Sequence, residues 1–159
     1  MQIITLLAAT ASLTTSSTAA PTGTSSGKDT AEYRWQVTGW SAGCARSGCY
    51  YDFNVTGPED GNIPCFQAYC SGDDVGYFKQ CEILSGSSTS SIPSVAAELD
   101  HYNTSTADGI AAMAVSLSFV DADSGARYNY TGHHNATYNQ FAAPLESFKI
   151  KPDSATAVL

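Results

Sequence analysis

Residues 113–119 read Met-Ala-Val-Ser-Leu-Ser-Phe and show the clearest periodicity in the chain. Large apolar side chains alternate with small or polar ones. Successive side chains of a β-strand point to opposite faces of a sheet, so this stretch predicts a strand with one buried face. The turn residues Asp121–Gly125 follow, and residues 127–130 are expected to return antiparallel beside the first strand as a hairpin.

Similar alternation recurs along the rest of the chain. The other segments with strand character are 33–37, 51–55, 65–70, 77–84, 95–99 and 146–150. Turn-forming residues separate them, and no segment keeps the 3.6-residue period of an amphipathic helix for long. We therefore expect an all-β domain, an antiparallel β-barrel or sandwich of about 7–9 short strands stabilised by disulfides. Trp40, near the end of the first strand, is the aromatic residue least easily placed in a core.

The N-terminal residues predict export from the cell. Residues 3–13 form a short apolar run, and small residues lead to Ala20 before Pro21. This pattern is typical of a cleaved secretory signal peptide, here residues 1–20. Residues 21–31 are rich in Gly, Ser and Thr and are expected to be a flexible mature N-terminus. Residues 32–159 are then a single secreted, extracellular β domain, and no later stretch is apolar enough to span a membrane.

The charge balance narrows the class of partner. The chain has 7 basic and 15 acidic residues and a net charge of -8. Nucleic acids and anionic membranes both attract Lys/Arg-rich surfaces, so neither is an expected partner.

Five cysteines lie within residues 44–81, and in an exported chain they predict a disulfide framework. The favoured pairings are Cys70 with Cys81, which bracket a turn-rich segment, and Cys44 with Cys49, which bracket a short turn. Cys65 is then unpaired or links two chains. A competing scheme pairs Cys44 or Cys49 with Cys65, and the sequence leaves that choice open.

Four Asn-x-Ser/Thr sequons predict N-glycosylation of the secreted chain. They begin at Asn54, Asn103, Asn129 and Asn135. Asn54 lies inside a predicted strand and is the one expected to stay unused.

Three groups of residues are candidates for a metal-binding or catalytic role, and a simpler structural explanation exists for each. Asp121–Gly125 resembles the start of a calcium loop but lacks the later acidic ligand, which favours a hairpin turn. His133 and His134 are adjacent, so on a strand they point to opposite faces and cannot share one metal. The third group is the carboxylates Asp52, Glu59, Asp60, Asp73 and Asp74, most of which fall in turns. With no nucleophile elbow, phosphate loop or metalloprotease motif, we expect no catalytic residue, metal site or cofactor.

Several short motifs are shared with a known family. Residues 33–37 read Tyr-Arg-Trp-Gln-Val, residues 51–55 read Tyr-Asp-Phe-Asn-Val, and residues 66–70 read Phe-Gln-Ala-Tyr-Cys before a lobe that ends at Cys81. Over about residues 33–84 the chain resembles the Alternaria major-allergen family of small secreted fungal proteins. The resemblance implies a non-enzymatic β-barrel that acts as an allergen or as an effector sensed by plants, and it maps Cys70 and Cys81 onto a family disulfide. The chain departs from the family in lacking its C-terminal bridge and in adding Cys44, Cys49 and Cys65.

The expected function is therefore that of a secreted, non-enzymatic fungal effector-like or allergen-like protein. Its expected partner is a host extracellular protein or a small apolar ligand, and the chain is expected to be a monomer or a Cys65-linked dimer. The alternatives are a small-ligand carrier barrel, a small secreted hydrolase that uses paired carboxylates, and a structural wall glycoprotein.

Overall fold

The computed structural model describes residues 33–86, 93–101, 109–140 and 143–159, and the predicted signal peptide, the mature N-terminus and Asn103 lie outside these ranges. Within them the chain forms ten strands and no helix. The strands are β1 Trp35–Ala45, β2 Gly48–Gly57, β3 Phe66–Asp73, β4 Lys79–Gln80, β5 Glu82–Gly86, β6 Ser94–Leu99, β7 Ile110–Val120, β8 Arg127–Thr137, β9 Glu146–Ile150 and β10 Ser154–Val158. The all-β prediction is confirmed.

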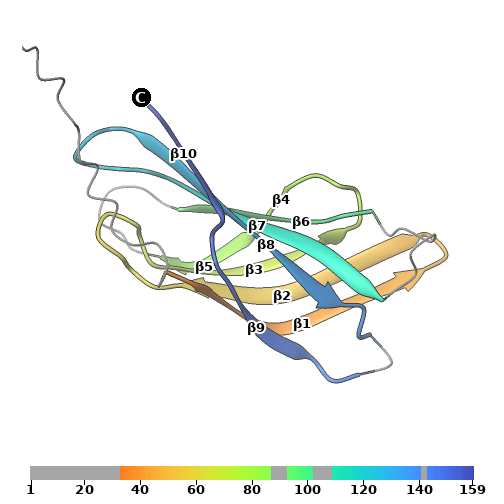
Figure 1. Ribbon diagram of the computed structural model, residues 1–159. Helices are drawn as coiled ribbons and strands as arrows, with labels where there is room; N and C mark the ends of the chain where they lie inside the picture. Colours follow the sequence, from red (N-terminus) through yellow and green to blue (C-terminus); the bar gives the residue numbers. More distant parts are fainter. Residues whose placement is uncertain (1–32, 87–92, 102–108, 141–142) are drawn as a thin grey trace, which may run out of the picture.

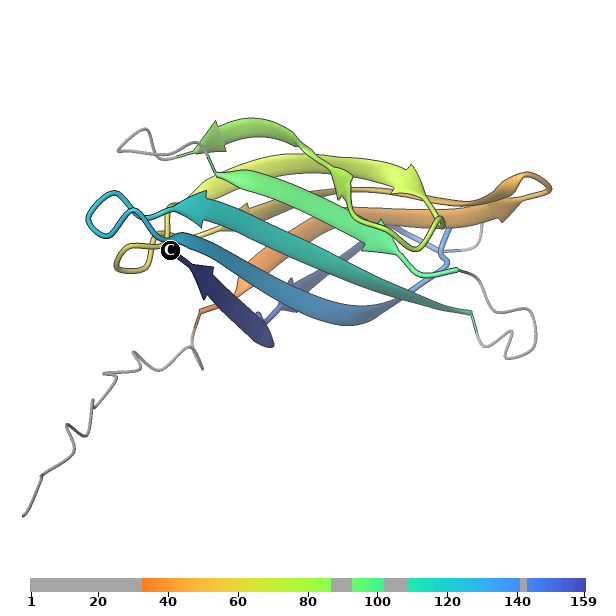
Figure 2. The same ribbon diagram turned by 90° about the horizontal axis from the view of Figure 1, so that it is seen from above.

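The strands make two antiparallel sheets of five strands each, which face one another as two layers (Figures 1 and 2). The first sheet has the order β5-β3-β2-β1-β9 and the second the order β10-β8-β7-β6-β4. The sheets are not closed into a barrel, so of the two predicted architectures the sandwich is the one that forms. The strand count exceeds the prediction for two reasons. The predicted strand 77–84 is divided at Cys81 into β4 and β5, and residues 154–158 form a strand without apolar alternation.

The predicted hairpin is the longest pairing of the second sheet. β7 and β8 pair over their full length, from Ile110 opposite Thr137 to Val120 opposite Arg127. β8 continues well past the predicted residue 130. Its inward positions there include Gly132 and Ala136, which carry little hydrophobic signal although both are buried.

The space between the sheets is filled by the inward residues of both. The largest fully buried side chains are Trp35, Trp40, Phe53, Leu99, Leu117 and Ile150. Trp40 belongs to this core, contrary to the sequence interpretation. A register shift between Thr38 and Ser41, where Gly39 has φ 69°, turns Trp40 inward. There it packs on Tyr51, Phe53 and Phe148, and its indole N–H donates to the Thr137 carbonyl at 2.8 Å.

Candidate interaction surface

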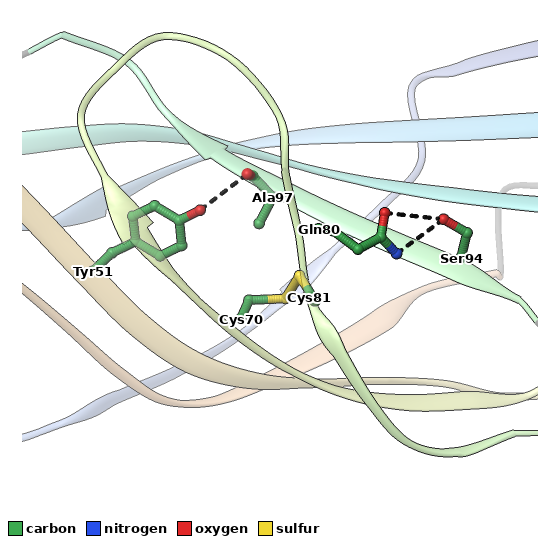
Figure 3. The surroundings of a disulfide bond; sticks show 6 residues. All are labelled: Tyr51, Cys70, Gln80, Cys81, Ser94 and Ala97. Atoms are coloured by element: carbon green, nitrogen blue, oxygen red, sulfur yellow. Dashed lines mark hydrogen bonds between the residues drawn. A yellow bond between two sulfur atoms is a disulfide. The ribbon is translucent and has the colours of Figure 1, made fainter.

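A disulfide closes the base of an exposed loop at one edge of the sandwich (Figure 3). Cys70 on β3 is bonded to Cys81, and both are buried. From β3 in the first sheet the chain passes to β4 in the second sheet, and after Cys81 it returns to the first sheet as β5. We call residues 71–80 the disulfide lobe. It joins the two layers, because residues 71–73 end β3 of the first sheet and residues 79–80 form β4 of the second.

Hydrogen bonds attach the C-terminal side of the lobe to β6. The Cys81 N–H donates to the Val95 carbonyl at 2.8 Å. The Gln80 side-chain N–H donates to the Ser94 hydroxyl at 3.0 Å. The Ser94 hydroxyl also donates to Oε1 of Gln80, at 3.3 Å (Figure 3). The Tyr51 hydroxyl donates to the Ala97 carbonyl at 2.9 Å and so joins the first sheet to the same strand (Figure 3).

The N-terminal side of the lobe is attached to the second disulfide. Asp74 and Cys49 form a reciprocal pair. The Asp74 N–H donates to the Cys49 carbonyl at 3.0 Å, and the Cys49 N–H donates to the Asp74 carboxylate at 3.1 Å. Cys49 is bonded to Cys44, directly opposite it in the β1–β2 hairpin. Both favoured pairings are thus present, and Cys65, half-buried just before β3, lies outside both bonds.

The tip of the lobe displays apolar side chains to solvent. Val75 is 37% exposed, Tyr77 is 63% exposed and Phe78 is 40% exposed. Gly76 between them has φ 67°, a left-handed conformation that favours glycine, and its N–H points to the Leu99 carbonyl at 3.4 Å. Three exposed apolar residues therefore lie within four positions of the chain. Exposed apolar groups that lie close together are a common feature of binding surfaces.

Three of the four predicted glycosylation sites lie in the described residues, on the outer faces of the sheets. Asn129 and Asn135 are both exposed and lie six positions apart on β8, so they share the outer face of the second sheet. Asn54 is half-buried on β2, opposite Thr38 and Tyr69 of its neighbours.

The two adjacent histidines point to opposite faces, as predicted. His133 faces outward, and its Nδ1 lies 2.9 Å from the Asp153 carboxylate. His134 faces inward and stacks on Phe148, with ring centroids 4.1 Å apart. Partial burial lowers the pKa of His134, and the nearby Glu146 carboxylate opposes that shift.

The Asp121–Gly125 segment is the hairpin turn that the sequence favours. The Asp121 N–H donates to the Ala126 carbonyl, and the Asp121 carboxylate accepts from the Asn62 amide and from the Asp123 N–H. These bonds, that of Asn62 foremost, hold the pKa of Asp121 below its usual value. In the described part of the chain no three His, Cys, Asp or Glu side chains come together as a metal site.

The five remaining carboxylates fall into two groups, with Asp52, Asp73 and Asp74 near one another on the paired strands β2 and β3 and their end, and Glu59 and Asp60 at the other end of β2. Asp52 is half-buried on β2, and burial raises its pKa. Glu59 and Asp60 lie in the β2–β3 connection, whereas Asp73 and Asp74 begin the lobe. A hollow of about 190 Å³ on the second sheet is lined by other residues, among them Glu98, Asp100 and His133.

The sequence did not identify the exposed lobe residues. Residues 77–84 alternate like a strand, and this alternation predicts strand positions for Tyr77 and Phe78. The informative signal was the Gly76 turn between two cysteines, which indicates a loop that a disulfide holds outside the sheet.

Comparison with known proteins finds no matching family model, no matching curated protein and no matching solved structure. The resemblance to the allergen family therefore remains a prediction. Among the described residues there is no helix long and apolar enough to cross a membrane.

Proposed function

We propose that this chain is a secreted, non-enzymatic protein of the effector type, and that its disulfide lobe binds a host extracellular protein. The observation that carries the proposal is the display of Val75, Tyr77 and Phe78 on a loop that a disulfide closes at its base. Tyrosine and other aromatic side chains are enriched at protein interfaces because they bury a large apolar area with few rotatable bonds.

The attachment of the lobe supports binding with little loss of conformational freedom. The disulfide, the Asp74–Cys49 pair and the β4–β6 pairing each hold the loop before any partner arrives. Ordering a flexible loop during association costs binding free energy, and a loop that is already ordered avoids most of that cost. The net charge of -8 further favours a basic protein over a nucleic acid.

The alternative functions draw less support from the geometry. A carrier barrel needs an internal ligand cavity, whereas Trp35, Trp40 and Phe53 fill the space between the sheets. A carboxylate hydrolase needs two carboxylates across a cleft, and none of the five candidate carboxylates lines either of the two hollows described for this structure. Alanine at each of those positions would test for hydrolysis directly, and an activity that depends on any of them would favour the hydrolase.

The test is capture of a partner from host extracellular fluid by the mature protein, followed by kinetics with the purified partner. Tyr77→Ser and Phe78→Ser should each weaken binding at least about tenfold, the effect of losing a buried interface aromatic. Leu84→Ser is the matched control, because Leu84 is 49% exposed on β5 outside the lobe. Equal binding by all three variants, or no specific partner in the extract, would reject the proposal.

A further inference from the structure

The outer face of the second sheet is hollowed over β7, which lies between β6 and β8 (Figure 2). The hollow has a volume of about 190 Å³. Its floor contains Ala112 and Ala114, whose small side chains leave the face low between the neighbouring strands. Ala112 lies opposite Asn135 of β8, and Ala114 lies between Glu98 of β6 and His133 of β8. The hollow is therefore bounded by polar residues on both sides of an apolar floor.

The spacing of the sheet gives the hollow the scale of one sugar ring. Neighbouring strands lie about 4.8 Å apart, so β6 and β8 are separated by about 10 Å across β7. Residues two positions apart on one face, such as Ala112 and Ala114, are separated by about 7 Å along the strand. A single pyranose fits a hollow of this width and length, whereas a longer oligosaccharide extends out of it.

The polar side chains at the rim are open to a ligand. Asp100, His133 and Asn135 are exposed, and Glu98 is half-buried. Burial raises the pKa of Glu98, and the neighbouring Asp100 carboxylate adds to this shift, so the two carboxylates face the same space. Neither carboxylate forms a hydrogen bond or a salt bridge with any described residue. Both can therefore accept from the hydroxyl or amide N–H groups of a ligand.

A second, smaller hollow lacks such open groups. It measures about 100 Å³ and is lined by Tyr33 and Asp153, among others. The Nδ1 atom of His133 lies within 3.0 Å of both oxygens of Asp153, so this carboxylate already has a partner. The larger hollow is therefore the one that can receive a polar ligand.

Asn135 places a predicted glycan at the rim of the larger hollow. It is the first residue of the sequon at 135–137, and its side chain lines the hollow. An N-linked glycan begins with N-acetylglucosamine on the asparagine side-chain nitrogen. This sugar donates through its hydroxyls and its amide N–H, and it presents an apolar C–H face and an acetyl methyl group. Because the covalent bond holds it beside the hollow, its effective concentration there is high, and weak contacts suffice to seat it.

Asn129 offers a comparison on the same strand and the same face. Its side-chain oxygen accepts from the Ser116 hydroxyl at 2.6 Å, and the residue lines neither of the two hollows. A glycan on Asn129 has no comparable seat beside it.

We propose that Asn135 is glycosylated and that the first N-acetylglucosamine of its glycan lies in the larger hollow. The acetyl methyl group packs on Ala112 and Ala114, and the sugar hydroxyls donate to Glu98 and Asp100. The sugar thereby bridges β6 and β8 across β7 and stabilises the second sheet. This role does not depend on binding by the disulfide lobe.

The test compares three forms of the chain secreted by a eukaryotic host that adds high-mannose glycans. One form keeps its full glycans, one is trimmed by endoglycosidase H to the first N-acetylglucosamine at each site, and one carries Asn135→Gln. Mass spectrometry of peptides should find a glycan on Asn135. NMR of the trimmed form should show nuclear Overhauser contacts between an acetyl methyl group and the methyl groups of Ala112 and Ala114. Asn135→Gln should raise the equilibrium constant of unfolding at least about fivefold, the effect of one hydrogen bond, whereas trimming should leave it unchanged.

Two further variants make each outcome decisive. Asn129→Gln is the matched control and should alter neither the Overhauser contacts nor the stability. Ala112→Leu fills the floor of the hollow and should abolish the contacts in a chain that still folds, because Ala112 is only half-buried. An Asn135 without a glycan, a glycan without contacts to the floor, or an equal loss of stability in Asn129→Gln would overturn the inference. Equal unfolding of the trimmed form and Asn135→Gln would overturn it as well.

Discussion

Removing the disulfide of the lobe is the most direct test of how its surface is maintained. In Cys70→Ala/Cys81→Ala the bond that closes the lobe is lost, whereas β3 and the β4–β6 pairing can still form. The separation of 11 residues corresponds to about 3 kcal/mol by the chain-entropy relation. The matched control is Cys44→Ala/Cys49→Ala, whose separation of 5 residues corresponds to about 2 kcal/mol.

Equilibrium unfolding in urea gives the free energies, and amide hydrogen exchange shows where each variant is loosened. We expect Cys70→Ala/Cys81→Ala to be the less stable variant, with faster exchange at Gly76 and Gln80, because both amides lie in the opened loop. The control should loosen the β1–β2 hairpin end instead. A loss below about 1 kcal/mol for the lobe bridge, with exchange in the lobe unchanged, would refute the argument that the disulfide holds this surface.

Three further predictions address other parts of the sandwich. Asn139 is 2% exposed, accepts from the Ala42 N–H and donates to two carbonyls. Asn139→Ala should therefore lower the free energy of unfolding in urea by about 3 kcal/mol. The exposed control Asn62→Ala should lower it by less than about 1 kcal/mol. The pKa of His134 is lower in the folded than in the unfolded chain, so its contribution to stability is complete above about pH 6.5 and is lost as the pH falls through the folded value. His134→Phe should therefore reduce the loss of stability between about pH 7 and pH 5, and equal pH profiles would contradict this. Thiol titration of the unreduced protein should find one reactive group at Cys65, and Cys65→Ser should abolish it.

The elements that the sequence predicted are those decided by side chains close together in the chain. The alternation over residues 113–119 predicted β7, and the Asp121–Gly125 turn predicted its return, because both depend on local periodicity and turn chemistry. The opposite directions of His133 and His134 follow from the same two-residue period. The bridge at Cys70 and Cys81 was favoured because turn residues separate the two cysteines by a short loop.

The failures occur where long-range pairing overrides the local pattern. Trp40 breaks the alternation of β1, and only the shift at Gly39, set by pairing with both β2 and β9, turns it into the core. β10 has no apolar period, because its five residues are all exposed and its strand character comes from pairing with β8. No periodicity within 154–158 could indicate this.

The disulfide lobe and the hollow lined by Tyr33 and Asp153 both lie where the chain passes from one sheet to the other. At one edge the crossing between β3 and β5 raises the disulfide lobe, and at the other the crossing from β9 to β10 places Asp153 beside Tyr33. Where the chain leaves a sheet, its residues lose a paired strand on one side, so apolar and polar side chains there remain partly exposed to solvent. Residues 77–84 look like one continuous strand because their alternation is the same whether they pair with one sheet or two. The site residues were therefore missed for the same reason as the strand division at Cys81, since which partner a segment pairs with is decided by contacts far away in the chain.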